Sequence, residues 1–201
     1  SRPSGSRLAK AMRFCSRLKL IVGREREAMI PETAAKHAGF VMAHAAAIAS
    51  VLELGELICP FVVVTKGDNR QSIEFESETQ DQAVDRAWSS LAEYRDQVDL
   101  WAMAREGLVS GQNGKDDVLV VAVWAPEMSD PIVFTQRFRP KARGFAIVGP
   151  VMMAQEVGNE AQLVAEWFFE GIAQHPKGEY WDAWRNAAQQ IAAGDAASPR
   201  A

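Results

Sequence analysis

The apolar run VLVVAVWA at Val118–Ala125 decides the fold of this 201-residue chain. Side chains of a β-strand alternate between the two faces of a sheet, so a run that is apolar at every position needs cover on both faces. We therefore expect a central strand here, with packed layers above and below it.

Further strands are predicted on both sides of this run, because apolar residues there alternate or cluster between turn residues. The segments are Ile58–Thr65, Gln71–Ser77, Asp99–Glu106, Ile132–Arg139 and Gly144–Gly149. The connections at 66–70 and around Pro140 are short, which favours antiparallel pairs. The polar stretch Ser110–Asp117 is expected to be a loop.

Helical periodicity marks the remaining segments. Pro31 suits a first helical position, and apolar residues recur at helical spacing as far as Leu54, which predicts a long alanine-rich helix. A capping box at Ser77–Gln80 or at Thr79–Gln82 predicts the start of a second helix. Two more helices, joined by a turn at 176–178, are predicted to end the chain.

The element order is therefore α-ββ-α-ββββ-αα, an α+β fold with a mostly antiparallel sheet of about five or six strands. The long N-terminal helix should pack on one face of the sheet, and the helix that begins near residue 79 allows one crossover. We divide the chain into a basic arm (1–26), an α+β core (27–155), a helical hairpin packed on the core or on a partner subunit (156–194), and a tail (195–201).

Charge is distributed unevenly along the chain. Residues 1–26 hold eight basic residues and one acidic residue, although the whole chain has a net charge of −4. The acidic remainder repels phosphate backbones, which argues against nucleic-acid binding except through the basic arm. No apolar stretch reaches the roughly 18 residues that predict a transmembrane helix. Cys15 and Cys59 form no disulfide pattern, which fits a reducing, cytoplasmic location.

Motifs of common enzymes and cofactor sites are absent from the sequence. It contains no GxSxG nucleophile elbow, no Walker phosphate loop and no GxGxxG dinucleotide motif. His37 and His44 share one helical face, and His175 is predicted to lie in a turn, but nothing in the pattern supplies a full ligand set. We interpret them as core or rim histidines and expect no metal and no cofactor.

Carboxylates suggest one enzymatic alternative. Glu74, Glu76 and Glu78 alternate along a predicted strand and its exit, so they should project from one face. Glu74 and Glu76, with Asp68 nearby, could hold a divalent cation in a small metal-dependent hydrolase or nuclease. The lysine that such a nuclease motif requires is missing, so the sequence leaves open whether the chain is an enzyme.

A basic cluster suggests binding instead. Arg137, Arg139, Lys141 and Arg143 fall within seven residues, and guanidinium groups suit carboxylates and phosphates, so the cluster could bind a small anion or an acidic protein. The plainer interpretation pairs these charges with the glutamates across one solvated face of the sheet.

Aromatic residues predict the partner. The C-terminal hairpin carries Trp167, Phe168, Trp181 and Trp184, more aromatic surface than two helices can bury between them, and such residues are enriched at interface centres. We therefore expect a homodimer that uses this hairpin. The expected function is that of a cytoplasmic binding or interaction domain with an exposed sheet face and a basic cluster.

Overall fold

The computed structural model describes residues 30–111, 114–155 and 160–188. Predictions made for the basic arm (1–26), for Cys15 and for the tail (195–201) lie outside these ranges. The elements, in chain order, are α2 (Glu32–Ala49), β1 (Phe61–Lys66), β2 (Asn69–Glu74), α3 (Gln80–Tyr94), β3 (Leu100–Gly111), β4 (Gly114–Trp124), β5 (Ile132–Arg139), the 3-10 turn η1 (Lys141–Arg143), β6 (Ala146–Met153), α4 (Ala161–Gln174) and the 3-10 turn η3 (Gly178–Tyr180). A further helix, called the C-terminal helix below, covers residues 181–188.

The strands of the described ranges form one sheet in the order β2-β1-β3-β4-β5-β6, and every neighbouring pair is antiparallel. β2 and β3 both run antiparallel to β1, which lies between them, so they are parallel to each other. α3 connects these two strands and is the crossover that the sequence allowed. The prediction of an α+β fold with a mostly antiparallel sheet is confirmed.

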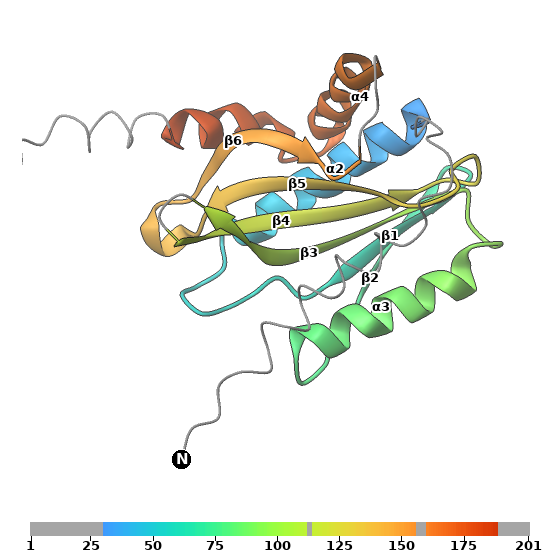
Figure 1. The fold of residues 1–201 in the computed structure, drawn as a ribbon, viewed down its shortest axis with the longest axis horizontal. Helices are drawn as coiled ribbons and strands as arrows, with labels where there is room; N and C mark the ends of the chain where they lie inside the picture. Colours follow the sequence, from blue (N-terminus) through green and yellow to red (C-terminus); the bar gives the residue numbers. More distant parts are fainter. Residues whose placement is uncertain (1–29, 112–113, 156–159, 189–201) are drawn as a thin grey trace, which may run out of the picture.

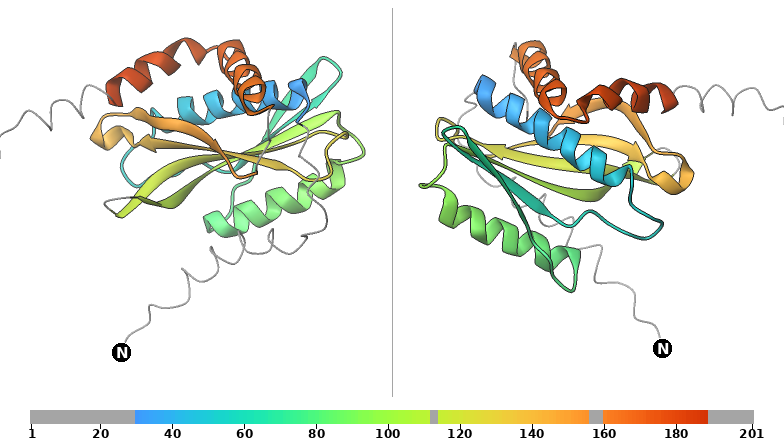
Figure 2. Two further views of the ribbon diagram at one scale, coloured as in Figure 1. Left: turned by 45° about the horizontal axis from the view of Figure 1, so that its top comes forward. Right: turned by 180° about the vertical axis from the view of Figure 1, so that it is seen from behind.

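Helices cover both faces of the sheet. α2 and α4 lie together on one face and α3 lies on the other (Figures 1 and 2). In β4, the neighbours Val121 and Ala122 point to opposite faces, and they are 0% and 5% exposed. The expectation that Val118–Ala125 is central and covered twice is therefore confirmed.

Aromatic packing attaches α3 to its face. Trp88 of α3 meets Trp101 of β3 edge to face, with ring centroids 5.7 Å apart, and Trp101 stacks on Trp124 of β4. The helix begins where the Thr79 hydroxyl oxygen accepts a hydrogen bond from the Gln82 backbone N–H at 3.3 Å. Of the two predicted capping boxes, the second is the one that forms this bond.

α2 is shorter than predicted, because it ends at Ala49 rather than at Leu54. Its 18 residues span roughly 27 Å at the usual rise of an α-helix. Val51 and Leu54 continue the apolar spacing but are 65% and 86% exposed, so they have nothing to pack against once the helix has crossed the sheet. Of the helices in the described ranges, none combines the length and apolarity that a bilayer crossing needs.

Two glycines let α4 pack directly on α2. A Cβ at Gly39 would overlap the backbone carbonyl of Phe168, and a Cβ at Gly171 would overlap that of Lys36. The backbones of the two helices therefore touch where these residues lie, and no other residue type fits there without moving a helix. This contact sets the distance of α4 from the sheet.

The loop predicted at Ser110–Asp117 is wrong. β3 continues to Gly111 and β4 begins at Gly114, and Ser110 pairs with Lys115 in the ladder. These two strands extend beyond the part of the sheet that helices cover. Their ends are exposed to solvent and carry polar side chains, so their composition resembles that of a loop.

Candidate ligand-binding pocket

An irregularity between β5 and β6 opens the sheet at its edge. Thr135 pairs with Met152, but Arg137, two residues later, pairs with Val148, so residues 149–151 of β6 oppose a single residue of β5. Gly149 has a φ of +69°, which favours glycine. Such bulges bend the strand that carries the extra residues, and they are common beside functional sites.

Gln136 is the residue of β5 that lies opposite the bulge. Its side chain is buried, with the residue 1% exposed. Its Nε2 group donates to the carbonyl oxygens of Arg137 and Val148 at 3.0 Å and approaches that of Gly149 at 3.4 Å. The amide thus replaces ladder hydrogen bonds that the bulge removes. Because three acceptors surround Nε2, Oε1 must face away from them, and no described residue donates to it.

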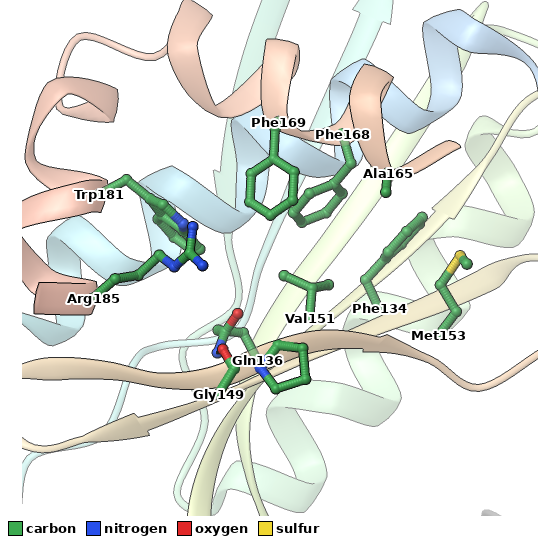
Figure 3. A pocket seen from close by; sticks show the side chains of 11 residues that line it. Phe134, Gln136, Gly149, Val151, Met153, Ala165, Phe168, Phe169, Trp181 and Arg185 are labelled. Carbon is green, nitrogen blue, oxygen red and sulfur yellow. The ribbon is translucent and has the colours of Figure 1, made fainter. Parts of the chain in front are cut away.

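A pocket of about 300 Å³ lies between this bulge, α4 and the C-terminal helix (Figure 3). This volume is at the lower end of the range for small-molecule sites. Its walls are mostly apolar and aromatic: Phe134, Val151, Met153, Ala165, Phe168 and Phe169. Phe134 of β5 and Phe168 of α4 stack with centroids 4.9 Å apart, which gives the pocket a rigid floor.

Trp181 and Arg185 form the polar end of the pocket. They are four residues apart in the C-terminal helix and so share one helical face. Figure 3 shows their side chains next to each other at one end, with Phe134 and Met153 at the other. Trp181 is 3% exposed, and its Nε1–H has no hydrogen-bond acceptor among the described residues.

Arg185 offers no acceptor to this N–H, since a guanidinium group only donates. Within the described ranges its one ion pair is with Asp182, whose Oδ1 lies 4.0 Å away on a side chain that is 88% exposed. A buried donor without an acceptor costs about 1–3 kcal/mol. Two donors lie side by side here with no acceptor between them. An anion would therefore form stronger hydrogen bonds at this end than elsewhere in the pocket.

Three of the four charges in the predicted basic cluster are already paired with carboxylates, and that of Arg139 is not. The side chain of Arg139 donates to a backbone carbonyl instead. The pairs are Arg137–Asp116 at 3.6 Å, Lys141–Glu53 at 2.5 Å, Arg143–Asp117 at 2.8 Å, and Arg139 Nε to the Gly144 oxygen at 2.6 Å. Arg139 Nη2 is buried and has no partner among the described residues, so one charge of the cluster is left without a counter-charge.

The idea that the glutamates and arginines share one sheet face is wrong. β2 and β5 lie three strands apart, with β1, β3 and β4 between them. Glu74 lies opposite Phe61 in the ladder, and the Phe61 ring packs against His44, so Glu74 is on the face that α2 covers. Phe134 of β5 packs on α4 on that same face, so Arg137, an odd number of residues later, is on the face that α3 covers. Periodicity within a strand indicates which residues share its faces, but not which strands are neighbours.

The predicted carboxylate site is not brought together either. Asp68 lies in the turn at one end of the β1–β2 hairpin and Glu74 at the other, roughly 20 Å apart at the usual rise of a strand. Glu76 and Glu78 follow the end of β2 and are not part of the strand. In the part of the chain that the structure describes, no three His, Cys, Asp or Glu residues are grouped as metal ligands would be.

The aromatic residues of the C-terminal hairpin are divided between core and edge. Phe168 and Trp181 are 1% and 3% exposed within the single chain, whereas Trp167 and Trp184 are only partly buried against the same core. Trp184 meets Phe145 edge to face at 5.2 Å. The hairpin thus packs on the core of its own chain, and its role in a dimer stays a prediction.

Sequence reasoning missed a pair of histidines. His44 of α2 and His175, at the end of α4, lie 131 residues apart in sequence, yet Nδ1 of the first and Nε2 of the second are 3.1 Å apart. The Lys177 N–H donates to His175 Nδ1, so Nε2 carries the proton and donates to His44. Burial, with the nearby charges of Arg70 and Lys177, lowers the pKa of His175 to about 4. Nε2 of His175 thus links the end of α4 to α2, and Nδ1 holds the turn that follows α4.

Sequence signals for the pocket do exist. Gln136 interrupts an otherwise apolar face of β5, Gly149 and Pro150 interrupt β6, and Trp181 and Arg185 show helical spacing.

Searches against protein-family models, curated proteins and solved structures gave no match to this chain. The case for the pocket as a site therefore depends on its own geometry.

Proposed function

We propose that this chain is a binding domain for a small, largely apolar molecule, held in the pocket between β5, β6, α4 and the C-terminal helix. The observation that carries the proposal is an apolar hollow whose lining includes a buried donor without a partner, the Nε1–H of Trp181. Ligand sites typically combine apolar walls with a few convergent polar groups. Buried polar groups in a structural core are usually paired.

The pocket is a better candidate than the basic cluster expected from the sequence. An external anion at Arg143 or Lys141 would have to displace an internal carboxylate, Asp117 or Glu53. Exposed ion pairs are worth under about 1 kcal/mol, so displacement is not forbidden, but Arg137, Lys141 and Arg143 are exposed, so water and salt screen an anion bound to them. The homodimer, the acidic partner and the cytoplasmic location stay predictions beside this proposal.

A neutral fluorescent probe tests the pocket. N-phenyl-1-naphthylamine should bind the wild type with a rise in fluorescence, because it exchanges water for aromatic walls. Ala165 is exposed on α4 yet lines the pocket, so Ala165→Phe should fill the hollow without disturbing the core and should weaken binding at least about tenfold.

Ala173→Phe is the matched control. Ala173 is also exposed on α4, but it does not line the pocket, so the same change there should leave probe binding intact. Equal probe binding by wild type and Ala165→Phe would show that the probe binds elsewhere, and the proposal would then fail.

A further inference from the structure

We infer that the ligand is an amphipathic carboxylate whose acid group lies between Arg185 and Trp181 and whose apolar body extends toward Phe134 and Met153. This inference depends on the proposed function, because it names the chemistry of the molecule that the pocket holds. It adds a chemical class and a direction within the pocket.

The acid group follows from two donors, the unpaired Nε1–H of Trp181 and the guanidinium of Arg185, whose one ion pair among the described residues is with the exposed Asp182. Trp181 Nε1–H and the Arg185 guanidinium converge from one helical face, and neither supplies an acceptor to the other. A carboxylate offers two acceptor oxygens, so one can accept from the indole N–H while the other accepts from the guanidinium. The carboxylate thereby removes the free-energy cost of burying the Trp181 N–H without an acceptor.

Charge selects anions over cations at this place. Among the described residues that line the pocket, Arg185 is the one with a charged side chain. Its side chain is 48% exposed, so it can shift to enclose a ligand without unfolding anything. A protonated amine would bring a second positive charge next to it, whereas a neutral alcohol would add no negative charge inside the pocket.

The apolar body follows from the other end of the pocket. Phe134 and Phe168 stack there, and Met153 completes the wall (Figure 3). None of these side chains carries a hydrogen-bond donor or a strong acceptor. The volume of about 300 Å³ equals roughly ten liquid-water volumes, which suits a short-chain or single-ring acid rather than a long lipid.

Three probes with the same tail test the inference. Octanoate, octanol and octylamine compete with N-phenyl-1-naphthylamine for the folded chain, and the competing concentration gives the affinity of each. Octanoate should bind about tenfold or more tightly than octanol, and octylamine should bind least. Ala165→Phe should reduce the binding of all three.

Substitutions at the polar end should act on the carboxylate alone. Arg185→Gln should weaken octanoate about tenfold and leave octanol unchanged, and Trp181→Phe, which keeps a ring but removes the N–H, should weaken octanoate severalfold. Arg137→Gln removes an arginine that is similarly exposed but belongs to the basic cluster, so it should change nothing. Thermal melting checks that each variant is folded.

The outcomes separate the two proposals. If octanol and octanoate bind equally and Ala165→Phe blocks both, the pocket stands but the carboxylate inference is overturned. If octanoate is preferred but only Arg137→Gln removes the preference, the acid group lies at the basic cluster and the inference is again overturned. If neither the dye nor any octyl probe binds the wild type, both proposals fail.

Discussion

The contact between α2 and α4 leads to a sharp prediction for Gly171→Ala. A Cβ at Gly171 would lie 2.8 Å from the Cα of Lys36 and closer still to its carbonyl oxygen, whereas carbon atoms in contact are about 3.5–4.0 Å apart. The obstacle is backbone inside a helix, so it cannot rotate away. α4 would have to move by roughly 1 Å, which opens the stacked core beneath it.

We expect Gly171→Ala to lower the free energy of unfolding by about 3 kcal/mol, at the upper end of overpacking effects. This loss would outweigh the gain of up to about 1 kcal/mol that alanine brings to a helix. The change should lower Tm by about 6–12 °C for a chain of this size.

Urea unfolding followed by circular dichroism measures this effect. Gly107→Ala is the matched control, because a Cβ there meets the end of the Arg105 side chain at 3.2 Å, which can move aside. We expect a change within about 1 kcal/mol for this control. A Gly171→Ala variant as stable as the wild type would show that the two helices are not in backbone contact.

Three further predictions concern single side chains. Burial lowers the pKa of His37, whose Nε2–H donates to the Val63 oxygen, to about 4. Below about pH 6.5 His37 is therefore protonated in the unfolded chain but stays neutral in the folded chain. The free energy of unfolding should fall by about 3 kcal/mol between pH 6.5 and 4. Urea titrations of His37→Gln should show a shallower fall, and an unchanged slope would contradict this assignment. Thr79→Ala removes the cap on the Gln82 N–H and should cost about 1 kcal/mol in thermal or urea unfolding, whereas no loss would mean that the cap does not form. Gln136→Leu leaves bulge carbonyls without a donor and should cost about 1–3 kcal/mol in the same assay, and a stabilised variant would refute the role of this amide.

The sequence was sufficient for the layers of the fold. The run at Val118–Ala125 predicted a central, doubly covered strand, and the alternative capping boxes at Ser77 and Thr79 predicted the start of α3 to within two residues, because these are signals within one element. The end of α2 could not be predicted in this way. Val51 and Leu54 continue the apolar spacing, and only the position of the sheet shows that nothing is left for them to cover.

The candidate site could be predicted only in part. Helical spacing places Trp181 and Arg185 on one face, but whether their donors have partners depends on the strands and helices around them. The pairing of β5 with β6, and the bulge opposite Gln136, are long-range features that a single strand does not encode. The same limit explains why the glutamates and arginines were expected to lie side by side.

The most direct test of the central claim is a crystal structure of the chain with 8-bromooctanoate, in which the anomalous signal of bromine locates the end of the tail. We expect one bromine peak beside Phe134 and Met153, with density for the carboxylate between Trp181 and Arg185. A bromine peak at the Arg185 end, a peak outside the pocket, or an empty pocket at saturating ligand would contradict the account.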